Sequence, residues 1–297
     1  MVSVLQDLVP WGYSVIQAVQ EFRHPILDIF FKFITVFGDK EAYLVILPIV
    51  YWCIDAKVGR RMSLLVLSSL GLNTFLKYVV AIPRPDAAKV SRLVVEITPA
   101  FPSGHAQGTS TLWGYLATQW AKLWFRVAVV TLILLVGMSR IYLGAHFPQD
   151  VLGGWLLTLV VLGLFLWLEP KVLPHLQGLP WWGQSLIAVL LPIAPFVISP
   201  SKTLAMIVGA FMGFGIGISL ERRFVRFDSS GTTKQRLLRL FGLLVVVVVW
   251  LGLKPVLSGN YVLRIIRYAL VGVTGACVVP MLYIRLGWAN KEDSKTS

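Results

Sequence analysis

The sequence predicts an all-α protein built as a bundle of helices that cross a membrane many times. Of its 297 residues, 57% are hydrophobic and only 14% are charged, and the mean hydropathy is +0.76. Soluble domains carry about 25% charged and about 45–50% apolar residues, so this composition lies outside their usual range. Several apolar stretches also reach the ~20 residues that a helix needs to cross a bilayer. These stretches argue against the alternative, a large soluble helical core.

The expected elements follow one another from the N-terminus. Residues 1–24 place apolar residues at helical intervals among polar ones, which favours a segment lying in the membrane interface. Ten spans follow, and the first two are short enough to be tilted or re-entrant. Their approximate ranges are 25–38, 41–54, 62–82, 105–121, 126–143, 150–168, 184–199, 203–220, 237–254 and 263–284. Six spans form a core over residues 25–168, four form a C-terminal extension over 169–286, and residues 287–297 are expected to be a solvated cytoplasmic tail.

The lysines and arginines of the loops indicate which side of the membrane each loop faces. With the N-terminus in the cytoplasm, more of them lie in cytoplasmic loops than in outer ones. Both termini are therefore expected inside, and the loops at 83–104 and 140–149 are expected together on the outer face. No removable signal peptide is recognised, which favours a multi-pass protein of the inner (cell) membrane. The net charge of +13 is explained by loop orientation and anionic headgroups, so no nucleic-acid partner is expected.

Small residues within the spans predict how the helices pack. Gly209, Gly213 and Gly217 recur on one helix face, where a neighbouring helix can approach closely. Packing within the chain is the preferred interpretation, and a homodimer contact is the alternative. Cys53 and Cys277 lie in apolar stretches and are interpreted as buried thiols, not as a disulfide or as metal ligands.

Three short polar clusters interrupt the apolar sequence near the predicted outer face. They are KYVVAIPRP at 77–85, PSGH at 102–105 and SRIYLGAHFPQD at 139–150. In the third cluster, His146 and Asp150 lie one helical turn apart, and Pro148 suits the first turn of a helix. A carboxylate beside an imidazole fixes its tautomer and supports positive charge on the ring. The pair therefore indicates a nucleophilic or general-base histidine.

Three cations accompany these clusters. Lys77, Arg84 and Arg140 would meet at one membrane face if their spans are neighbours. Cations held together repel one another unless an anion joins them, and guanidinium groups match phosphate oxygens. Each cation alone is explained by anchoring at the membrane edge. Their coincidence with two histidines favours a binding site for an oxyanion.

The PSGH cluster supplies the other wall of such a site. Gly104 lets backbone N–H groups approach an anion, and Ser103 adds a hydroxyl donor. The helix that begins near His105 directs its free N–H groups the same way. His105 is then placed to donate a proton to a departing oxygen. A turn at Ser103–Gly104 is the structural alternative.

Together the clusters resemble the motifs of the type 2 phosphatidic acid phosphatase family, which is related to the vanadium haloperoxidases. The matching residues are Lys77, Arg84 and Pro85, then Pro102, Ser103, Gly104 and His105, then Ser139, Arg140, His146 and Asp150. No motif residue departs from the pattern, and the match covers about residues 60–160. The resemblance implies a helical membrane core with its active site at the outer leaflet.

The resemblance also implies a metal-independent phosphatase that needs no cofactor. His146 would attack phosphorus and form a phosphohistidine, Asp150 would orient His146, and His105 would protonate the leaving oxygen and later activate water. The residues implied to hold the phosphoryl oxygens are Lys77, Arg84, Ser103, Gly104 and Arg140. Phosphoryl transfer depends on positioning and charge stabilisation, which fixed cations can supply. The sequence has no obvious carboxylate cluster suited to Mg²⁺.

The motifs recognise phosphate and leave the rest of the substrate open. Candidate substrates are phosphatidate, phosphatidylglycerophosphate, sphingoid phosphates and polyprenyl diphosphates such as undecaprenyl diphosphate. A phosphotransferase with the same phosphohistidine is one alternative, and a transporter that binds lipid phosphate without hydrolysis is another. A binding-only site needs no acid and no nucleophile, which argues against the transporter. The spans after about residue 184 lie outside the resemblance and have no derived role.

Overall fold

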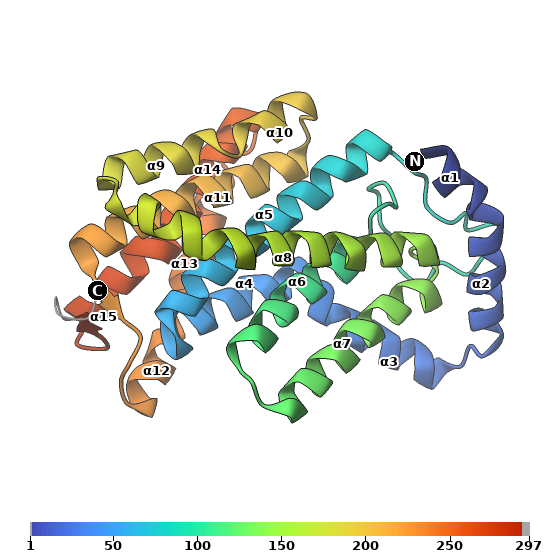
Figure 1. Cartoon of the computed structure of the whole chain (residues 1–297), viewed down its shortest axis with the longest axis horizontal. Helices are drawn as coiled ribbons and strands as arrows, with labels where there is room; N and C mark the ends of the chain where they lie inside the picture. The colour runs from blue at the N-terminus through green and yellow to red at the C-terminus, as the bar shows by residue number, and fades with distance from the viewer. Residues whose placement is uncertain (1, 293–297) are drawn as a thin grey trace. The chain divides into compact units, whose positions relative to one another are not determined.

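Helices form nearly all of the regular structure in the computed structural model, which describes residues 2–292 (Figure 1). The contacts within the chain divide these residues into two compact units. Unit 1 runs to Tyr43 and includes Leu72–Leu166, and unit 2 contains Leu44–Gly71 and the chain from Trp167 onward. Helices α4 (Lys40–Ile49), α5 (Ala56–Val80) and α8 (Pro148–Gly178) each contribute residues to both units. The all-α prediction is confirmed.

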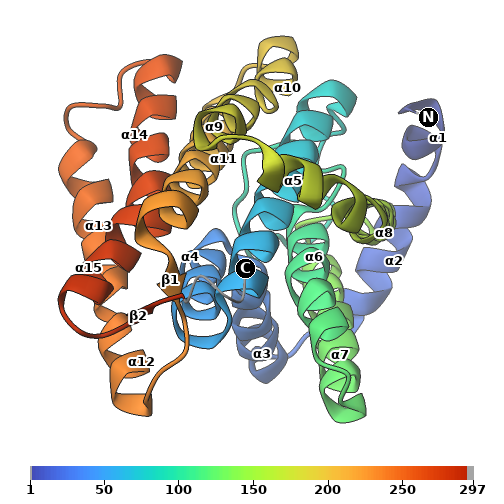
Figure 2. The same ribbon diagram turned by 60° about the vertical axis from the view of Figure 1, so that its left-hand side comes forward.

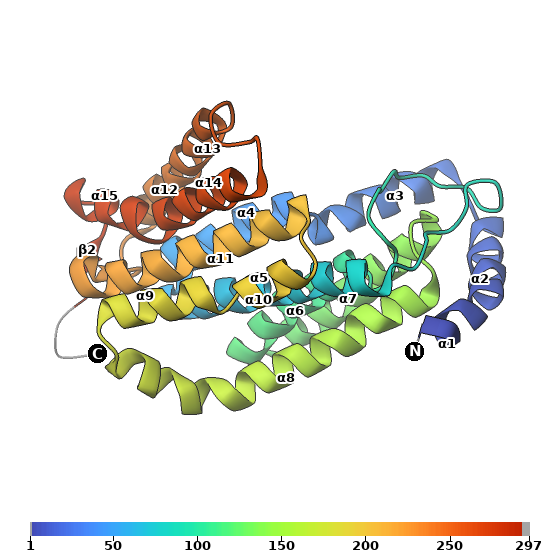
Figure 3. The same ribbon diagram turned by 90° about the horizontal axis from the view of Figure 1, so that it is seen from above.

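Unit 1 is a group of helices around α7. Besides parts of α4, α5 and α8, its elements are α1 (Val2–Asp7), α2 (Val9–Glu21), α3 (Pro25–Thr35), the short 3-10 helix η1 (Val36–Gly38), α6 (Gly104–Gln119) and α7 (Leu123–Tyr142). Helix α7 packs against α2, α3 and α6. Residues 81–103 join α5 to α6 without any helix or strand, as the irregular loop in Figure 3 shows. Pro83 and Pro85 cannot donate helix hydrogen bonds, which explains why helix α5 does not continue.

Unit 2 is organised around α11. Besides parts of α4, α5 and α8, its elements are η2 (Val50–Ile54), α9 (Trp181–Leu190), α10 (Ile193–Ile198), α11 (Lys202–Leu220), η3 (Glu221–Val225), β1 (Phe227–Asp228), α12 (Thr233–Arg239), α13 (Phe241–Leu253), α14 (Tyr261–Val273), η4 (Thr274–Val278), α15 (Val279–Arg285) and β2 (Asn290–Lys291). Helices α11 and α14 lie side by side, with α13 next to α14 (Figure 2). The two short strands pair in antiparallel fashion, Phe227 opposite Lys291.

Seven helical segments among the described residues are long and apolar enough to cross a membrane. They are Ala56–Val80, Leu123–Tyr142, Pro148–Gly178, Trp181–Ile198, Lys202–Val225, Thr233–Leu253 and Tyr261–Arg285. The chain is therefore an integral membrane protein. The other three predicted spans correspond to shorter helices: α3 with 11 residues, α4 with 10 and α6 with 16. The predicted count of ten is thus not reproduced, and the division into six core and four extension spans stays a prediction.

Two segments also differ from expectation. The span predicted at 150–168 continues as α8 to Gly178, with Pro170 and Pro174 inside the helix. The expected tail at 287–297 begins with residues that turn back, because Asn290 and Lys291 pair with β1; residues 293–297 lie outside the described chain. The expected N-terminal interfacial segment contains α1 and α2, and the ring of Tyr13 meets that of Phe147 edge-on at 5.1 Å.

The glycine stripe of α11 packs against α14 and η4 of the same chain. A Cβ at Gly213 would overlap the backbone of Ala269, and one at Gly217 would lie 2.6 Å from the Cβ of Ala276. Helix packing within the chain is therefore confirmed. Because this face is covered, a homodimer would have to use another surface, and it stays a prediction.

Gly213→Ala should lower the thermal unfolding midpoint of the detergent-solubilised protein. The added methyl group would collide with the carbonyl group of Ala269, and overpacking of this kind costs about 1–3 kcal/mol. Gly252→Ala on α13 is the matched control, because nothing lies within 4 Å of a Cβ there and alanine favours a helix. Equal midpoints for the two variants would contradict close packing at Gly213.

Candidate active site

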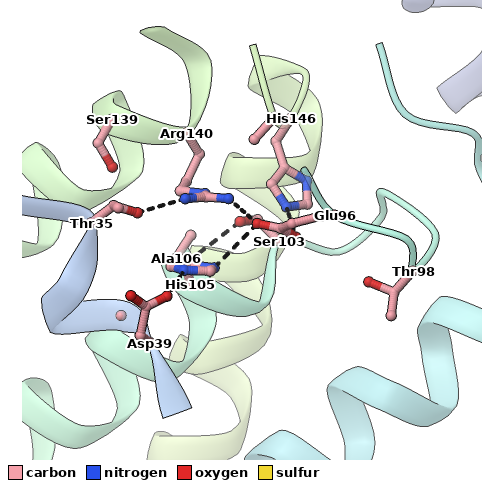
Figure 4. Close-up of polar contacts among 12 residues, drawn as sticks. Thr35, Asp39, Glu96, Thr98, Ser103, His105, Ala106, Ser139, Arg140 and His146 are labelled. Carbon is pink, nitrogen blue, oxygen red and sulfur yellow. Dashed lines mark hydrogen bonds and ion pairs between the residues drawn. The ribbon is translucent and has the colours of Figure 1, made fainter. Parts of the chain in front are cut away.

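The predicted site residues all belong to unit 1 and lie near helix ends or in the loops that join them. Lys77 and Arg140 lie in the last turns of α5 and α7, and Asp150 lies in the first turn of α8. Ser103 precedes α6, and Gly104 is its first residue. The carboxylate of Glu96 has the guanidinium groups of Arg84 and Arg140 and the rings of both motif histidines around it. Figure 4 shows Glu96 together with Arg140, His105 and His146. Ser103, Arg140, His146 and Asp150 are almost completely buried. The site is therefore built from rigid helix ends and one irregular loop.

The start of α6 is held by contacts with its neighbours. Ser103 caps the helix, and its Oγ accepts a hydrogen bond from the N–H of Ala106 at 3.5 Å. The N–H of Ser103 donates to the carbonyl oxygen of Asp150 at 2.9 Å, which ties α6 to α8. A Cβ at Gly104 would lie 3.2 Å from Oδ1 of Asn73, so a larger residue would require the Asn73 side chain to shift slightly. These contacts fix the helix end from which His105 projects.

The environment of His146 determines which ring nitrogen carries the proton. Nη1 of Arg84 lies 3.1 Å from Nε2 of His146, and a guanidinium group can only donate, so Nε2 must accept. The proton then resides on Nδ1, which faces Oδ2 of Asp150 at 3.4 Å. Asp150 is itself held by the N–H of Phe147 at 2.9 Å. Nε2 thus keeps its lone pair, as a nucleophile requires.

The charge state of His146 follows from its surroundings. Burial, together with the positive charges of Lys77, Arg84 and Arg140, lowers the pKa of His146 well below its ordinary value. The side chain is only 1% exposed, so water does little to offset these effects. The imidazole is consequently neutral at physiological pH.

Arg84 is held by the loop that carries it and by its neighbours in unit 1. Its Nε donates to the carbonyl oxygen of Thr98 at 2.6 Å, and its Nη1 donates to that of Ala145 at 2.8 Å. Its Nη2 lies 2.5 Å from Oε2 of Glu96. The planar guanidinium is therefore oriented before any substrate binds.

Glu96 was not selected from the sequence, yet its carboxylate lies at the centre of the site. It forms ion pairs with Arg84 and Arg140, and its two oxygens lie 3.9 Å from Nδ1 of His105 and 3.9 Å from Nε2 of His146. Burial alone would raise the pKa of Glu96, but the charges of Arg140, His105 and Arg84 lower it overall. Glu96 is therefore an anion. The sequence offered one signal for Glu96: it lies in the loop between the first two motifs, where Asp86 is the only other carboxylate.

Two further residues outside the motifs contact motif side chains. Nη1 of Arg140 donates to Oγ1 of Thr35 at 2.5 Å. Nε2 of His105 lies 2.8 Å from Oδ1 of Asp39. Both partners come from the segment at the end of α3, which has no motif character. Nothing in the sequence places this segment beside α6 and α7.

Lys77 lies at the edge of the site. Its Nζ donates to the carbonyl oxygens of Pro99 at 2.6 Å and Ala100 at 3.0 Å, so it holds the loop that precedes α6. Direct contact of Lys77 with a phosphoryl oxygen stays a prediction. Among residues 2–292 no group of three or more His, Cys, Asp and Glu side chains is arranged to hold a metal ion.

Comparison with known families agrees with the motifs. The sequence profile described as "PAP2 superfamily" matches residues 59–173, which contain every predicted site residue. The profile described as "PAP2 superfamily phosphatase, transmembrane extension" matches residues 205–291. The chain belongs to the PAP2 superfamily. The second profile also shows that the helices beyond the motifs are a recurring extension within PAP2 proteins.

Individual PAP2 relatives have low sequence identity to this chain. "Lipid phosphate phosphatase delta" of Arabidopsis thaliana is 27% identical over 194 residues, which cover 57% of this chain and 46% of that protein. "Glucose-6-phosphatase 3" of Bos taurus is 30% identical over 207 residues, 61% of this chain and 58% of that protein. The chain thus matches about half the length of these relatives. Among solved structures, a PAP2-type phosphatidylglycerolphosphate phosphatase from Bacillus subtilis is 27% identical, covers 56% of this chain and 88% of its own, and gives a TM-score of 0.48.

Proposed function

We propose that this PAP2 protein is a membrane lipid phosphatase that removes a phosphomonoester or diphosphate headgroup through a phosphohistidine. The substrate classes considered are phosphatidate, phosphatidylglycerophosphate, sphingoid phosphate and polyprenyl diphosphate. The reaction would need neither a metal ion nor a cofactor, because the cations of the chain itself surround the phosphoryl position.

The position of the Glu96 carboxylate is the observation that supports this proposal most directly. A carboxylate is planar and a phosphoryl group is tetrahedral, but both carry anionic oxygens that guanidinium groups bind. Arg84 binds Oε2 of Glu96 and Arg140 binds Oε1, so the carboxylate is shared by two guanidinium groups and lies between the ring nitrogens of His105 and His146. A phosphoryl group in the same place would have a nucleophile on one side and an acid on the other.

The chemistry follows from this placement. Nε2 of His146 would attack phosphorus and form a P–N bond, while the P–O bond to the lipid breaks. His105 would give its proton to the departing oxygen, so the lipid leaves as a neutral alcohol from a phosphomonoester and as the lipid monophosphate from a diphosphate. In the second half, His105 would take a proton from water, whose oxygen attacks phosphorus and breaks the P–N bond. Arg84 and Arg140 would stabilise the charge on the equatorial oxygens in both steps.

The surroundings of Glu96 favour a substrate with an apolar part. Its neighbours Val95 and Ile97 are 88% and 97% exposed, which is unusual for large aliphatic side chains in water. A pocket of about 300 Å³ opens beside Arg84 and Glu96 and is lined also by Ile82, Pro83 and Ile97. These apolar groups suit an acyl or prenyl chain next to the phosphate. A relative named as a lipid phosphate phosphatase is consistent with this.

The proposed setting is the inner (cell) membrane, with the site on the outer face and both termini in the cytoplasm. All proposed catalytic groups come from unit 1 of one chain, so the reaction itself needs no second copy. The proposed partners are the lipid phosphate and the surrounding membrane lipids. Thiol labelling from outside intact cells of a Lys89→Cys variant, in a background without Cys53 and Cys277, tests the orientation, because Lys89 lies in the exposed loop beside the site.

Phosphate release tests the function. The detergent-purified protein is incubated with phosphatidate, phosphatidylglycerophosphate, sphingosine phosphate, undecaprenyl diphosphate and, as a soluble comparison, glucose 6-phosphate. Each reaction is run with and without EDTA. We expect release from at least one lipid, undiminished by EDTA. Release only from glucose 6-phosphate would reject the lipid assignment, and loss of activity with EDTA would reject metal independence.

Absence of release from every substrate would leave two other functions to separate. Labelled phosphate appearing on an added lipid or sugar alcohol would identify a phosphotransferase. Binding of the lipid phosphates without any turnover would identify a binding or transport protein. Either result would overturn the phosphatase proposal.

Glu96→Gln should tighten the binding of substrate and of vanadate, which mimics the phosphoryl transition state. Because the carboxylate of Glu96 occupies the position of the phosphoryl group, the two compete for Arg84 and Arg140. Removing its charge should lower KM and the inhibition constant of vanadate by about 10-fold, equivalent to one charge-assisted contact of roughly 1.5 kcal/mol. Steady-state kinetics and vanadate titration measure both.

Asp86→Asn is the matched control for Glu96→Gln. Asp86 lies in the same loop, is exposed, and its carboxylate accepts from the N–H of Ala88 within that loop. Neither constant should change in this variant. Weaker vanadate binding by Glu96→Gln would contradict a competition between Glu96 and the phosphoryl group.

The acid limb of kcat/KM should lie at low pH and should move upward in Arg84→Gln. The nucleophile must be neutral, and the lowered pKa of His146 keeps it neutral below the ordinary imidazole value of about 6.5. Arg84 is one of the charges that lower this pKa, so its removal makes protonation easier and shifts the limb to higher pH. The same substrate is used for both proteins, so its own ionisation cancels in the difference.

Lys89→Gln serves as the control for this pH shift. It removes one positive charge from the same loop, but from an exposed side chain that stacks on the ring of Tyr13. Its profile should match that of the wild type. An unshifted or downward-shifted limb in Arg84→Gln would show that His146 does not set the acid limb.

A further inference from the structure

The two ring nitrogens of His105 face different carboxylates (Figure 4). Nε2 lies 2.8 Å from Oδ1 of Asp39, within hydrogen-bond distance. Nδ1 lies 3.9 Å from Oε1 of Glu96, the oxygen that marks the phosphoryl position. One nitrogen is therefore engaged by a fixed residue, and the other is directed at the place where the P–O bond would break.

Asp39 is held against α6 by its own turn. A Cβ at Gly38 would lie 2.9 Å from Cδ2 of His105, so the backbone before Asp39 packs directly on the imidazole. The hydroxyl of Tyr43 donates to the carbonyl oxygen of Gly38 at 3.2 Å. The ring of Tyr43 in turn packs on Gly108, one turn further along the helix that carries His105. The contact between Asp39 and His105 is thus built into the packing of the turn.

Stability alone does not explain this contact. The side chain of Asp39 is 37% exposed, and ion pairs that water reaches contribute little to folding. The same segment also supplies Thr35 to Arg140. The segment thus orients two motif side chains, although it contains no motif residue itself. Its contact with His105 involves the ring nitrogen Nε2, where a proton can be held.

We propose that Asp39 is a positioning residue for the proton-transfer step, which compels His105 to act through Nδ1. The inference rests on the function proposed above. The carboxylate accepts a hydrogen bond and so keeps a proton on Nε2. Protonated His105 gives the Nδ1 proton to the leaving oxygen and becomes neutral with its Nε2 proton retained. In the second half, Nδ1 takes a proton from the attacking water.

The arrangement is the reverse of that at His146. There the carboxylate of Asp150 faces Nδ1, and Nε2 is left to react. Here the carboxylate holds Nε2, and Nδ1 is left. The two reacting nitrogens consequently point at the same Glu96 carboxylate from different helices, each 3.9 Å away.

Asp39→Asn tests the inference through the leaving group. The variant loses the charge that holds His105, so proton donation suffers while nucleophilic attack is retained. For an alkyl phosphate such as phosphatidate, kcat/KM should fall about 10–100-fold, which is less than the ~10²–10⁴-fold expected from removing the acid itself. For p-nitrophenyl phosphate it should change by less than about twofold, because p-nitrophenolate leaves without a proton and needs no general acid.

Two controls isolate the effect. Glu41→Gln removes the same charge two positions away, from a largely exposed side chain that pairs with Lys40, and should leave both substrates unaffected. In the double variant with His105→Ala, Asp39→Asn should cause no further loss, because its effect passes through His105.

The activity of the wild type distinguishes failure of this inference from failure of the proposed function. If the wild type releases no phosphate from any substrate, the proposed phosphatase itself is rejected. If the wild type is active, equal losses of Asp39→Asn on both substrates would indicate a structural role and overturn this inference alone. No loss on the alkyl phosphate, or full additivity with His105→Ala, would overturn it as well.

Discussion

His146→Ala should abolish phosphate release from every substrate, with a loss of about 10⁴-fold or more in kcat. Nε2 of His146 lies 3.9 Å from Oε2 of Glu96, at the proposed phosphoryl position, and it carries no proton because it accepts from Arg84. Removal of a nucleophile eliminates the covalent route, whereas removal of an orienting group only slows it. Release of inorganic phosphate from the purified variant measures the loss.

His175→Ala is the matched control for the same substitution. His175 is exposed, and its Nδ1 contacts only the carbonyl of Lys171 in the hydrogen bonds that the structure describes. It should retain full activity. Because His146 is buried, size-exclusion elution and the thermal midpoint are compared in parallel, so that a folding defect is recognised.

The covalent intermediate gives a second, independent measure of His146. With p-nitrophenyl phosphate, the His105→Ala protein should still be phosphorylated but should release phosphate slowly, because no base activates the water. Labelled phosphate should therefore accumulate on the protein in an acid-labile, alkali-stable form, and it should be absent when His146 is also replaced. Full turnover by His146→Ala, or labelling that survives its removal, would refute the nucleophile assignment.

Arg140→Lys should lower kcat/KM by about 10²-fold and Arg140→Ala by about 10³-fold or more, on the scale known for arginines that stabilise phosphoryl transfer. Arg140 is 2% exposed in its side chain, and it reaches Thr35 and Glu96 with separate nitrogens of one planar group. Lysine keeps the charge but cannot make both contacts in fixed geometry. Vanadate should bind more weakly to both variants, and its inhibition constant provides the second measurement.

Arg126→Lys on the same helix is the control for Arg140→Lys. Arg126 lies at the opposite end of α7, is exposed, and donates to the carbonyl of Ala117. Its kcat/KM should stay within about twofold of the wild type, as surface substitutions normally do. A lysine at position 140 with wild-type kinetics would show that charge alone suffices, and that the fixed guanidinium geometry seen between Thr35 and Glu96 is not needed for substrate binding.

The fold class and most helices could be predicted because a membrane allows few choices. Apolar stretches of sufficient length must form helices, since no water is present to satisfy the backbone. Their ends were less predictable. Helix α8 passes through Pro170 and Pro174 to Gly178, whereas the apolar pattern suggested an end at 168. The segments at 25–38, 41–54 and 105–121 are apolar enough to predict spans, and all three contain helices shorter than a full span.

The glycine stripe illustrates what periodicity can and cannot predict. Its spacing indicated a close helix contact, and Gly213 indeed packs on the backbone of Ala269. The sequence did not identify α14 as the partner. Partner choice depends on the shape of two complete helix surfaces, and spacing on one of them does not contain that information.

By itself, the sequence determined that this is a helical membrane protein, and it singled out the three clusters to which the proposed phosphate chemistry is assigned. Those residues are recognisable because their chemistry depends on residue type and on spacing along single helix ends. Only the tertiary structure decided that Glu96 lies between the two histidines and that Asp39 and Thr35 support His105 and Arg140. Such contacts join segments far apart in the chain. They depend on how helices and loops pack, which no local pattern of residues encodes.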